Sequence, residues 1–234
     1  MKALITAAGM GTRLGNITKD TNKCILNVGN KPLLLHSVEI LKNVGIDDIY
    51  VIIGHHGEKI KQLLGDKVNY IYNPDYATTS ILGSIVLAKE HLFQSEFVFL
   101  TGDSLLHPEL IKGLLEPSQD VLVSIELKKC NEEDMKVVLE NHNIKEISKT
   151  ISLDQAQGEY TSLTRFPKES STVFFNEVEK AINNQNCKTY VADILLNLQN
   201  LGFNLKPIYT NKPRIEIDFL EDLEKAQALY KQYF

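Results

Sequence analysis

Apolar strand-like runs alternate with helical patterns along residues 1–126, and this alternation constrains the fold more than any other feature of the chain. We expect strands at Lys2–Ala8, Asp48–Ile53, Val68–Asn73, Phe97–Thr101 and Val121–Glu126. Between them, apolar residues recur every three or four positions, which predicts helices at Leu33–Val44, Glu58–Leu64, Ser80–His91 and Pro108–Leu115. Such an order is typical of β-α-β units. The sequence therefore predicts an α/β fold with a mostly parallel central sheet flanked by helices.

After Glu126 the pattern changes to short alternating strands, expected at Lys136–Glu140, Ile144–Ser148 and Tyr160–Arg165. They predict a small antiparallel extension over the sheet. The remaining elements are two helices, two strands and a closing helix, at Lys168–Asn183, Val191–Leu201, Leu205–Tyr209, Arg214–Ile217 and from Leu220 onward. With 234 residues, 43% of them hydrophobic, the chain can bury a full core. We expect a single domain over 1–234, with residues 1–126 and 127–234 as its two halves.

The first expected strand ends in a glycine turn that contains an arginine, Gly9-Met10-Gly11-Thr12-Arg13. Close backbone N–H groups and positive charge are what a nucleoside triphosphate needs. A dinucleotide fingerprint would require glycine in place of Leu14 and an acid about 20 residues later, and a Walker loop would require Gly-Lys-Ser/Thr; the chain has neither. The alternative is a purely structural turn, because glycine adopts positive φ at little cost. Lys23, a second cation nearby, favours the nucleotide.

Composition limits which binding partners and which cellular compartment we expect. The formal net charge is −5 and no basic run is present, which argues against nucleic acid or an anionic membrane as a partner. No apolar run approaches the roughly 18 residues of a membrane span. The three cysteines, Cys24, Cys130 and Cys187, are widely spaced and form no C-x-x-C pair, as expected in a reducing cytoplasm without a cysteine metal site. We therefore expect a cytoplasmic protein.

The chain resembles the nucleotidyltransferase superfamily along essentially its whole length. The resemblance lies in Ala7-Ala8-Gly9-x-Gly11-Thr12-Arg13-Leu14, Lys23, Lys31-Pro32-Leu33, Asn73-Pro74, Thr101-Gly102-Asp103, Asp134-Met135-Lys136-Val137, Gly158-Glu159-Tyr160 and Glu216-Ile217-Asp218. It implies a Rossmann-like nucleotidyltransferase fold whose antiparallel extension covers the acceptor site. It also implies that the protein joins a nucleoside triphosphate to a phosphorylated sugar or small alcohol and releases pyrophosphate.

The resemblance assigns roles to the first loops. Arg13 is expected to hold the β- and γ-phosphates, together with the backbone N–H groups of the glycine loop, and Lys23 to reach the α-phosphate, where charge develops. These two are the expected catalytic residues. The expected nucleotide-binding residues are Ala7, Ala8, Gly9, Gly11, Thr12, Arg13, Asn73, Thr78 and Gly102. Many relatives have proline before the lysine, where this chain has Asn22; we expect a change in loop stiffness and no loss of the lysine.

Two aspartates are candidate ligands of Mg²⁺, the expected cofactor. Asp103 follows the strand Phe97–Thr101, and Asp218 follows Arg214–Ile217, so both are expected where strand ends meet the ligand crevice. Magnesium prefers oxygen ligands and usually takes one or two protein carboxylates. Taken alone, each aspartate is more often a turn or N-cap residue than a metal ligand. The match of both to family positions favours metal binding.

Three further residues are candidates for the acceptor site. Lys136 is expected to pair with the acceptor's phosphate, or else to be an ordinary exposed strand residue. Glu216 either binds a cationic substrate group or faces solvent. Tyr160 either lines the acceptor site or packs in the core with its hydroxyl hydrogen-bonded.

The donor and acceptor follow from a closer resemblance. The segments Asp75–Ser84 and Asp134–Val137 are similar to those of choline-phosphate, inositol-1-phosphate and 2-aminoethylphosphonate cytidylyltransferases. CTP and a small phosphorylated or phosphonylated acceptor are therefore the expected substrates. A uridylyl-, thymidylyl- or guanylyltransferase acting on a sugar phosphate remains an alternative, as does a non-catalytic nucleotide-binding protein. A homodimer is left open.

Overall fold

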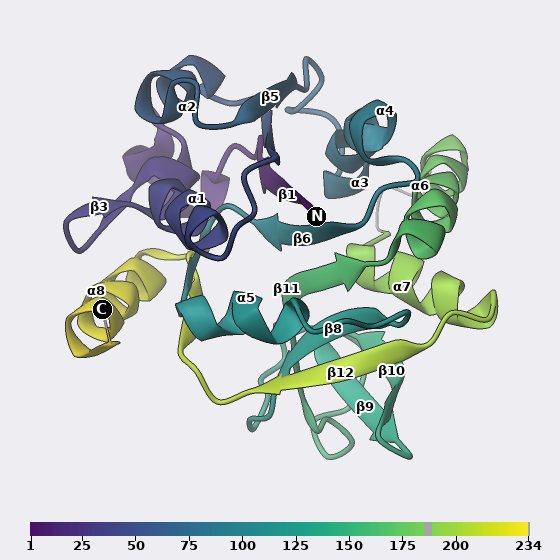
Figure 1. Ribbon diagram of the computed structural model, residues 1–234. Helices are drawn as coiled ribbons and strands as arrows, with labels where there is room; N and C mark the ends of the chain where they lie inside the picture. Colours follow the sequence, from purple (N-terminus) through teal and green to yellow (C-terminus); the bar gives the residue numbers. More distant parts are fainter. Residues whose placement is uncertain (185–188, 234) are drawn as a thin grey trace.

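The computed structural model describes residues 1–184 and 189–233. Strands and helices alternate through the first half of the chain. The strands form one large mixed sheet, and the helices flank it (Figure 1). The strands are β1 (Lys2–Ala7), β2 (Asn27–Val28), β3 (Lys31–Pro32), β4 (Ile49–Ile53), β5 (Asn69–Tyr72), β6 (Phe97–Thr101), β7 (Ser104–Leu106), β8 (Val121–Glu126), β9 (Lys136–Glu140), β10 (Asn143–Ser148), β11 (Gly158–Phe166), β12 (Leu205–Thr210) and β13 (Arg214–Glu216).

The helices cover both faces of the sheet (Figure 1). The α-helices are α1 (Leu33–Asn43), α2 (Gly57–Leu64), α3 (Ile81–Ile85), α4 (Lys89–Leu92), α5 (Pro108–Leu114), α6 (Lys168–Asn183), α7 (Val191–Asn200) and α8 (Leu220–Tyr233). Short 3₁₀ turns are η1 (Thr12–Thr18), η2 (Lys23–Ile25) and η3 (Val86–Ala88). Pro108 stands at the start of α5, where its missing N–H costs no helical hydrogen bond.

The main sheet has the order β10-β9-β11-β6-β1-β4-β5. Its part from β6 to β5 is parallel, as predicted, because helices carry the chain from one strand to the next. The predicted antiparallel strands continue the same sheet through β11, which pairs antiparallel with β6, β8 and β9. Strand β12 adds to β8 in parallel. Strands from both predicted halves thus share one sheet, while the division of the chain into two halves stays a prediction.

Two features differ from the sequence prediction. The expected helix Ser80–His91 is divided into α3, η3 and α4. The short strands β2, β3 and β7 were not predicted, because two or three residues are too few to establish an alternating pattern. One of them matters for the site: β7 pairs antiparallel with β13, with Ser104 opposite Glu216.

Apolar side chains form a core on each face of the main sheet and a smaller third cluster beneath α8. One face buries Phe97, Phe166 and Phe174, which pack ring against ring. The third cluster contains Leu14 of η1 and Ile217 beyond β13. Helix α8 therefore packs against both η1, which follows the loop after β1, and the segment that follows β13.

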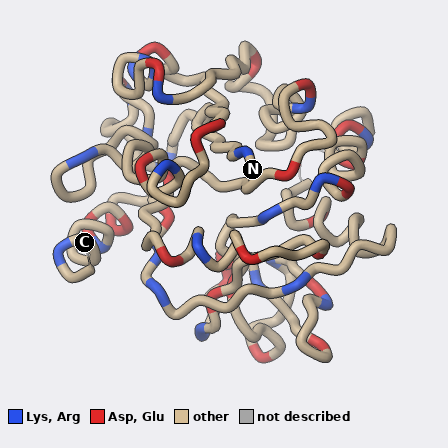
Figure 2. The backbone as a smooth tube through the Cα atoms, viewed as in Figure 1, with Lys and Arg blue, Asp and Glu red and all other residues tan. Residues whose placement is uncertain are grey.

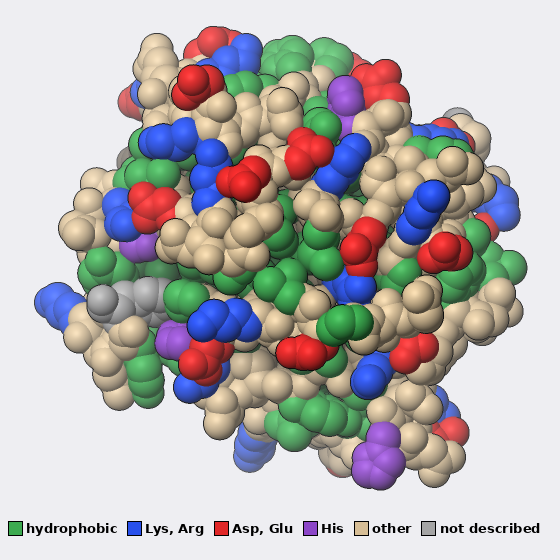
Figure 3. All heavy atoms as spheres, viewed as in Figure 1, with side chains coloured by type: hydrophobic (Ala, Val, Ile, Leu, Met, Phe, Trp, Pro, Cys, Tyr) green, Lys and Arg blue, Asp and Glu red, His purple; other side chains and the backbone are tan. Residues whose placement is uncertain are grey.

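The surface carries both signs of charge. Lysine and arginine are interspersed with aspartate and glutamate along the backbone, and the face shown by the space-filling view has no extended patch of one sign (Figures 2 and 3). An anionic substrate must therefore be met by a few placed cations. Within residues 1–184 and 189–233, no helix combines the length and apolarity needed to cross a membrane. Cys24 and Cys130 are free thiols, and Cys187 lies outside the described residues.

Candidate active site

In the loop after β1, the backbone carbonyls of Ala7, Ala8 and Gly9 accept hydrogen bonds, whereas several backbone N–H groups donate none among the described residues. The carbonyls of Ala7 and Gly9 accept from the Asn22 side chain at 3.0 and 3.3 Å, and that of Ala8 accepts from the N–H of His55 at 3.1 Å. By contrast, within the described part of the chain, the backbone N–H groups of Gly9, Met10 and Gly11 have no hydrogen-bond partner. Three successive open donors at the carboxyl end of a parallel strand form a site for an anion.

Glycine is required at position 11 by both conformation and space. Its φ is +63°, and a Cβ there would lie 3.1 Å from Thr18 Cγ2 and 3.2 Å from Lys23 Cβ. The Thr18 hydroxyl donates to the carbonyl of Gly11 at 2.8 Å. The chain can therefore turn sharply here and bring Lys23 against the loop.

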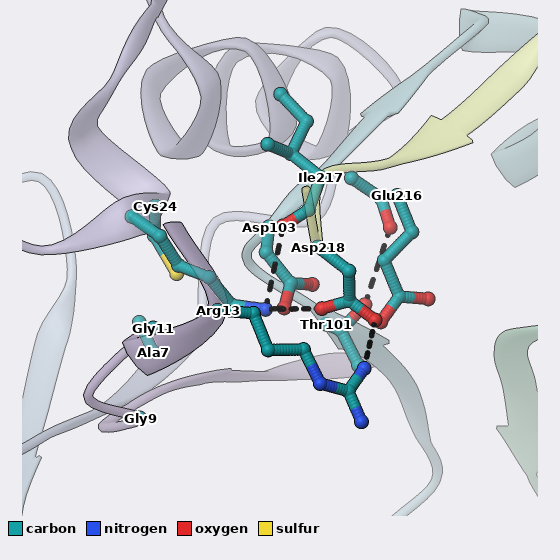
Figure 4. Close-up of polar contacts among 12 residues, drawn as sticks. Ala7, Gly9, Gly11, Arg13, Cys24, Thr101, Asp103, Glu216, Ile217 and Asp218 are labelled. Carbon is teal, nitrogen blue, oxygen red and sulfur yellow. Dashed lines mark hydrogen bonds and ion pairs between the residues drawn. The ribbon is translucent and has the colours of Figure 1, made fainter. Parts of the chain in front are cut away.

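Lys23 lies between the two predicted metal ligands. Its Nζ is 2.6 Å from Asp103 Oδ2 and 2.9 Å from Asp218 Oδ1, and Arg13 Nη1 is 3.0 Å from Asp218 Oδ2 (Figure 4). Strands β6 and β13 bring the two aspartates together, because the N–H of Ile217 donates to the carbonyl of Asp103 at 3.0 Å. The sequence-predicted pair of acids and pair of cations therefore meet in one cluster.

The charges in this cluster stabilise one another. Burial alone would lower the pKa of Lys23, but the carboxylates of Asp103 and Asp218 raise it far above its ordinary value. Burial would likewise raise the pKa of Asp218, but Lys23 and then Arg13 hold it below its ordinary value. Lys23 is therefore a permanent cation in the free protein, and Asp218 a permanent anion, at neutral pH.

Glu216 completes an acidic group. One carboxylate oxygen from each of Asp103, Glu216 and Asp218 lies within 4.8 Å of the other two. Burial, and then the neighbouring Asp103, raise the pKa of Glu216 to about 7, although Arg214 Nη2 pairs with its carboxylate at 2.8 Å. The sequence left open whether Glu216 faces solvent; its side chain is about one third exposed and points toward the two aspartates (Figure 4).

The acidic group fits a hard divalent cation. Asp103 Oδ1 is buried and has no hydrogen-bond partner among the described residues, which leaves a carboxylate oxygen available as a ligand. Mg²⁺ usually takes oxygen donors from one or two carboxylates and completes its shell with phosphate oxygens and water. Asp103, Asp218 and Glu216 are the residues that would hold it.

Two more predicted nucleotide-binding residues follow the carboxyl ends of β6 and β5, the outer strands of the parallel part of the sheet. Gly102 packs closely: a Cβ there would lie 3.1 Å from the carbonyl oxygen of Thr6 and 3.3 Å from Cys24 Sγ. Asn73 follows β5 and is buried, and its amide donates to the hydroxyls of Thr79 and Ser84 at 3.1 and 2.9 Å. Asn73 thus shapes the loop that presents the exposed Thr78. Their contacts with a nucleotide stay predictions.

Lys136 and Tyr160, which were predicted to contact the acceptor, are enclosed by protein. The Nζ of Lys136 is surrounded by the carbonyls of Glu132, Asp134 and Lys149, at 3.0, 3.4 and 2.6 Å, and the residue is fully buried. The Tyr160 hydroxyl lies 2.8 Å from that of Thr164, and burial raises its pKa. Their roles toward the acceptor stay predictions, but both side chains have a structural function in the free protein.

Sequence reasoning missed two polar residues. Asn22 was noted only for standing where relatives have proline, yet its buried amide connects two strand-end loops. Arg214 was not singled out, although it lies 3.8 Å from Glu159 and 2.8 Å from Glu216, with its Nε buried and without a partner in the described structure. A signal was available for Arg214 alone: an arginine in a short strand, two residues before Glu216.

Comparison with known proteins gives the family. The model of the MobA-like NTP transferase domain matches residues 3–155, which is more than half of the chain and includes the open amides, Arg13, Lys23 and Asp103. The chain belongs to the MobA-like NTP transferase family. It is therefore an enzyme of the nucleotidyltransferase class.

Several relatives of this NTP transferase are cytidylyltransferases. It is 28% identical to a choline-phosphate cytidylyltransferase from Streptococcus pneumoniae, covering 99% of both chains, and 25% identical to a CTP:phosphoglutamine cytidylyltransferase from Campylobacter jejuni, covering 96% of this chain and 98% of the other. It is also 34% identical over 119 residues to a CMP-5'-(3-aminopropyl)phosphonate synthase from Streptomyces rubellomurinus. That match covers 49% of this chain and 19% of the relative.

A solved structure confirms the fold. The inositol-1-phosphate CTP transferase from T. maritima superimposes with a TM-score of 0.83, covering 99% of this chain and 95% of that one, at 21% sequence identity. At this identity the match supports the architecture, and the predicted nucleotidyltransferase fold is thereby confirmed.

Proposed function

We propose that this NTP transferase is a Mg²⁺-dependent cytidylyltransferase that transfers CMP from CTP to a small acceptor bearing a phosphate or phosphonate. The observation that carries the proposal is one arrangement at the end of β1. Three open backbone donors and two cations, Arg13 and Lys23, lie beside a group of carboxylates suited to Mg²⁺. The similarity to cytidylyltransferases over 96–99% of the chain supports CTP as the donor.

In this proposal the protein positions charge and performs no proton transfer. An oxygen of the acceptor's phosphate attacks the α-phosphorus of CTP, and the bond to the bridging oxygen of the leaving pyrophosphate breaks. A phosphomonoester has a second pKa near ~6, so its attacking oxygen is already an anion at neutral pH and needs no general base. The rate then depends on alignment and on stabilising the charge of the transition state.

Each placed group has a part in this scheme. The amides of Gly9, Met10 and Gly11 and the guanidinium of Arg13 bind the β- and γ-phosphates, and Lys23 stabilises charge at the α-phosphate. Mg²⁺ held by the carboxylates would supply further positive charge to the phosphate oxygens. Because nucleoside triphosphates are its substrates, we place the enzyme in the cytoplasm.

The proposal is tested by pairing CTP, UTP, dTTP, GTP and ATP with several acceptors and measuring pyrophosphate release. The acceptors are phosphocholine, aminoethylphosphonate, glycerol phosphates, inositol phosphate and sugar phosphates. We expect CTP to exceed the other nucleotides by at least roughly tenfold in kcat/KM, because a base site that pairs with the cytosine amine leaves buried groups unpaired with UTP, at a cost of ~1–3 kcal/mol each.

Pyrophosphate release should require the acceptor as well as CTP. If dTTP or UTP with glucose-1-phosphate exceeds every pairing with CTP, the enzyme is a sugar-phosphate nucleotidyltransferase. If no pairing releases pyrophosphate although nucleotides bind, the protein is a non-catalytic nucleotide-binding member of the family.

A further inference from the structure

Asn22 occupies the centre of the contacts between two loops at the sheet edge. Its side chain is fully buried, and its Nδ2 donates to Ala7 O at 3.0 Å, to Gly9 O at 3.3 Å and to His55 O at 2.8 Å. Its Oδ1 accepts from the N–H of Cys24 at 2.9 Å. One amide thus connects the loop after β1, the loop after β4 and the turn η2.

We propose that Asn22 is a positioning residue that sets the phosphate-binding loop and presents Lys23 to it. This inference rests on the proposed function, because it takes the loop after β1 to be where the phosphates bind. It assigns to a single side chain both the orientation of the open amides and the placement of the catalytic cation.

The hydrogen bonds explain how one residue achieves this. By holding the carbonyls of Ala7 and Gly9, the Asn22 amide keeps their negative ends directed into the protein, where they cannot repel an anion. The N–H groups of the same loop stay open. As the N-cap of η2, Asn22 also fixes the start of the turn whose first residue is Lys23.

The second loop is fastened to the same centre. The N–H of His55 donates to Ala8 O, while the carbonyl of His55 accepts from Asn22, so the two loops are joined in both directions. The rings of His55 and His56 reach the carbonyls of Thr18 and Lys19, at 3.2 and 3.1 Å, and add a third connection. Movement of one loop is therefore transmitted to the other.

A proline at this position would limit the backbone by its ring, but it would have no side-chain donor. The backbone of Asn22, with φ −88° and ψ 140°, has the extended conformation that proline also allows. Asn22 thus fixes the start of η2 by hydrogen bonds that a proline could not form. An aspartate, although of the same size, would place a carboxylate against three carbonyl oxygens and close to the expected phosphates.

The test compares Asn22→Asp with Asn197→Asp. Asn197 is on α7, on the opposite side of Figure 1 from α8, and its amide donates to Glu177 Oε2 at 3.3 Å; its replacement also sets a carboxylate against an oxygen. Binding of Mg·CTP is measured by calorimetry, kcat and KM by pyrophosphate release, and loop order by amide hydrogen exchange in peptides containing His55 and Leu14. Both amides are hydrogen-bonded within these loops.

We expect Asn22→Asp to speed exchange in both peptides at least about tenfold, to weaken Mg·CTP binding at least about tenfold and to lower kcat. Asn197 is exposed, so we expect Asn197→Asp to lower the Tm much less and to leave all three readouts within twofold of the parent. If Asn22→Asp does not fold, Asn22→Ser takes its place. Serine keeps an acceptor for the Cys24 N–H but has a single donor, so smaller changes in the same direction are expected.

Exchange at the parental rate in the folded variant would overturn the connection between the loops. Faster exchange with unchanged Mg·CTP binding and kcat would overturn its role toward the nucleotide. A parent enzyme that binds no nucleoside triphosphate would instead contradict the proposed function, while the exchange experiment would still decide whether Asn22 orders the loops.

Discussion

At the scale of single residues, the aspartates of the candidate site are paired with lysine and arginine side chains of the same site. Lys23 pairs with both aspartates that are expected to hold a metal, and its ammonium stands where a cation would bind. The sequence identified these residues from their places at strand ends or beside the glycine loop together with the resemblance to the family. It could not predict that they pair with one another, since contacts between side chains distant in sequence depend on how the strands are arranged. The same dependence on the arrangement of the strands explains why the burial of Lys136 and its contacts with backbone carbonyls could not be predicted; its role toward the acceptor stays a prediction.

Lys23→Met should tighten divalent-ion binding by the nucleotide-free protein while lowering kcat. The ammonium lies 2.6 and 2.9 Å from the carboxylate oxygens, so its removal frees an added cation from the competition and repulsion of Lys23, while Arg13 remains beside Asp218. We expect Mn²⁺, followed by electron paramagnetic resonance, to bind at least about tenfold more tightly. The expected loss in kcat is roughly 10²-fold, the scale of one strong electrostatic contact in a transition state.

Lys31→Met is the matched control, because this lysine pairs with Glu39 at the surface and has no contact with the acidic group. It should leave Mn²⁺ affinity unchanged. Equal or weaker Mn²⁺ binding by Lys23→Met would contradict the idea that lysine and metal compete for the same oxygens.

At the scale of elements, short strands that the sequence did not predict hold the closing helix in place. The long strands and most helices could be predicted from periodicity, but β2, β3 and β7 could not. The two-residue strands β2 and β3 form a hairpin, against which α8 packs through Gln227 and Tyr230. The side-chain amide of Gln227 accepts from the N–H of Gly29 and donates to Asn27 O, both at 2.9 Å. The hairpin therefore fixes the closing helix.

Gly29→Ala should weaken this docking and lower the free energy of unfolding by about 2–4 kcal/mol. Gly29 has φ +65°, and a Cβ there would overlap the ring of Tyr230. The expected cost combines left-handed strain with overpacking. Urea denaturation measures it.

Gly65→Ala separates the two contributions. Gly65 also has a positive φ, +57°, but a Cβ there meets nothing within 4 Å. Its replacement should cost about 1–3 kcal/mol from backbone strain alone, because its ψ is −129°, and less than the replacement of Gly29, which adds the overlap with Tyr230. Equal losses in the two variants would show that Tyr230 moves aside freely and that the hairpin does not fix α8.

At the scale of the whole molecule, the two predicted halves are connected through β11. This strand of the second half lies between β6 and β8 of the first half and pairs with both. Its Arg165 is almost fully buried, pairs with Glu96 and donates to the carbonyl of Glu116 at 2.8 Å. The sequence predicted the strands of each half, but it could not predict their order, because strand order is set by long-range pairing.

Unfolding should accordingly be a single transition. Far-UV circular dichroism and the fluorescence of the nine tyrosines, in a chain without tryptophan, should give coincident urea curves. Residues 1–126 expressed alone should show no cooperative unfolding, because β6 and β8 would each lack β11. Two separated transitions in the whole chain, or a cooperative fragment, would contradict this expectation.

The pairing of β7 with β13 also has a consequence during synthesis on the ribosome. Asp103 and Lys23 are made early, but Asp218 reaches them only after β13 has emerged and paired with β7. A growing chain can thus form its first parallel strands while its acidic group is still incomplete. Nascent chains that stall before residue 218 would carry the loop after β1 without the full set of carboxylates, and would therefore be unable to assemble the metal site proposed for the finished protein.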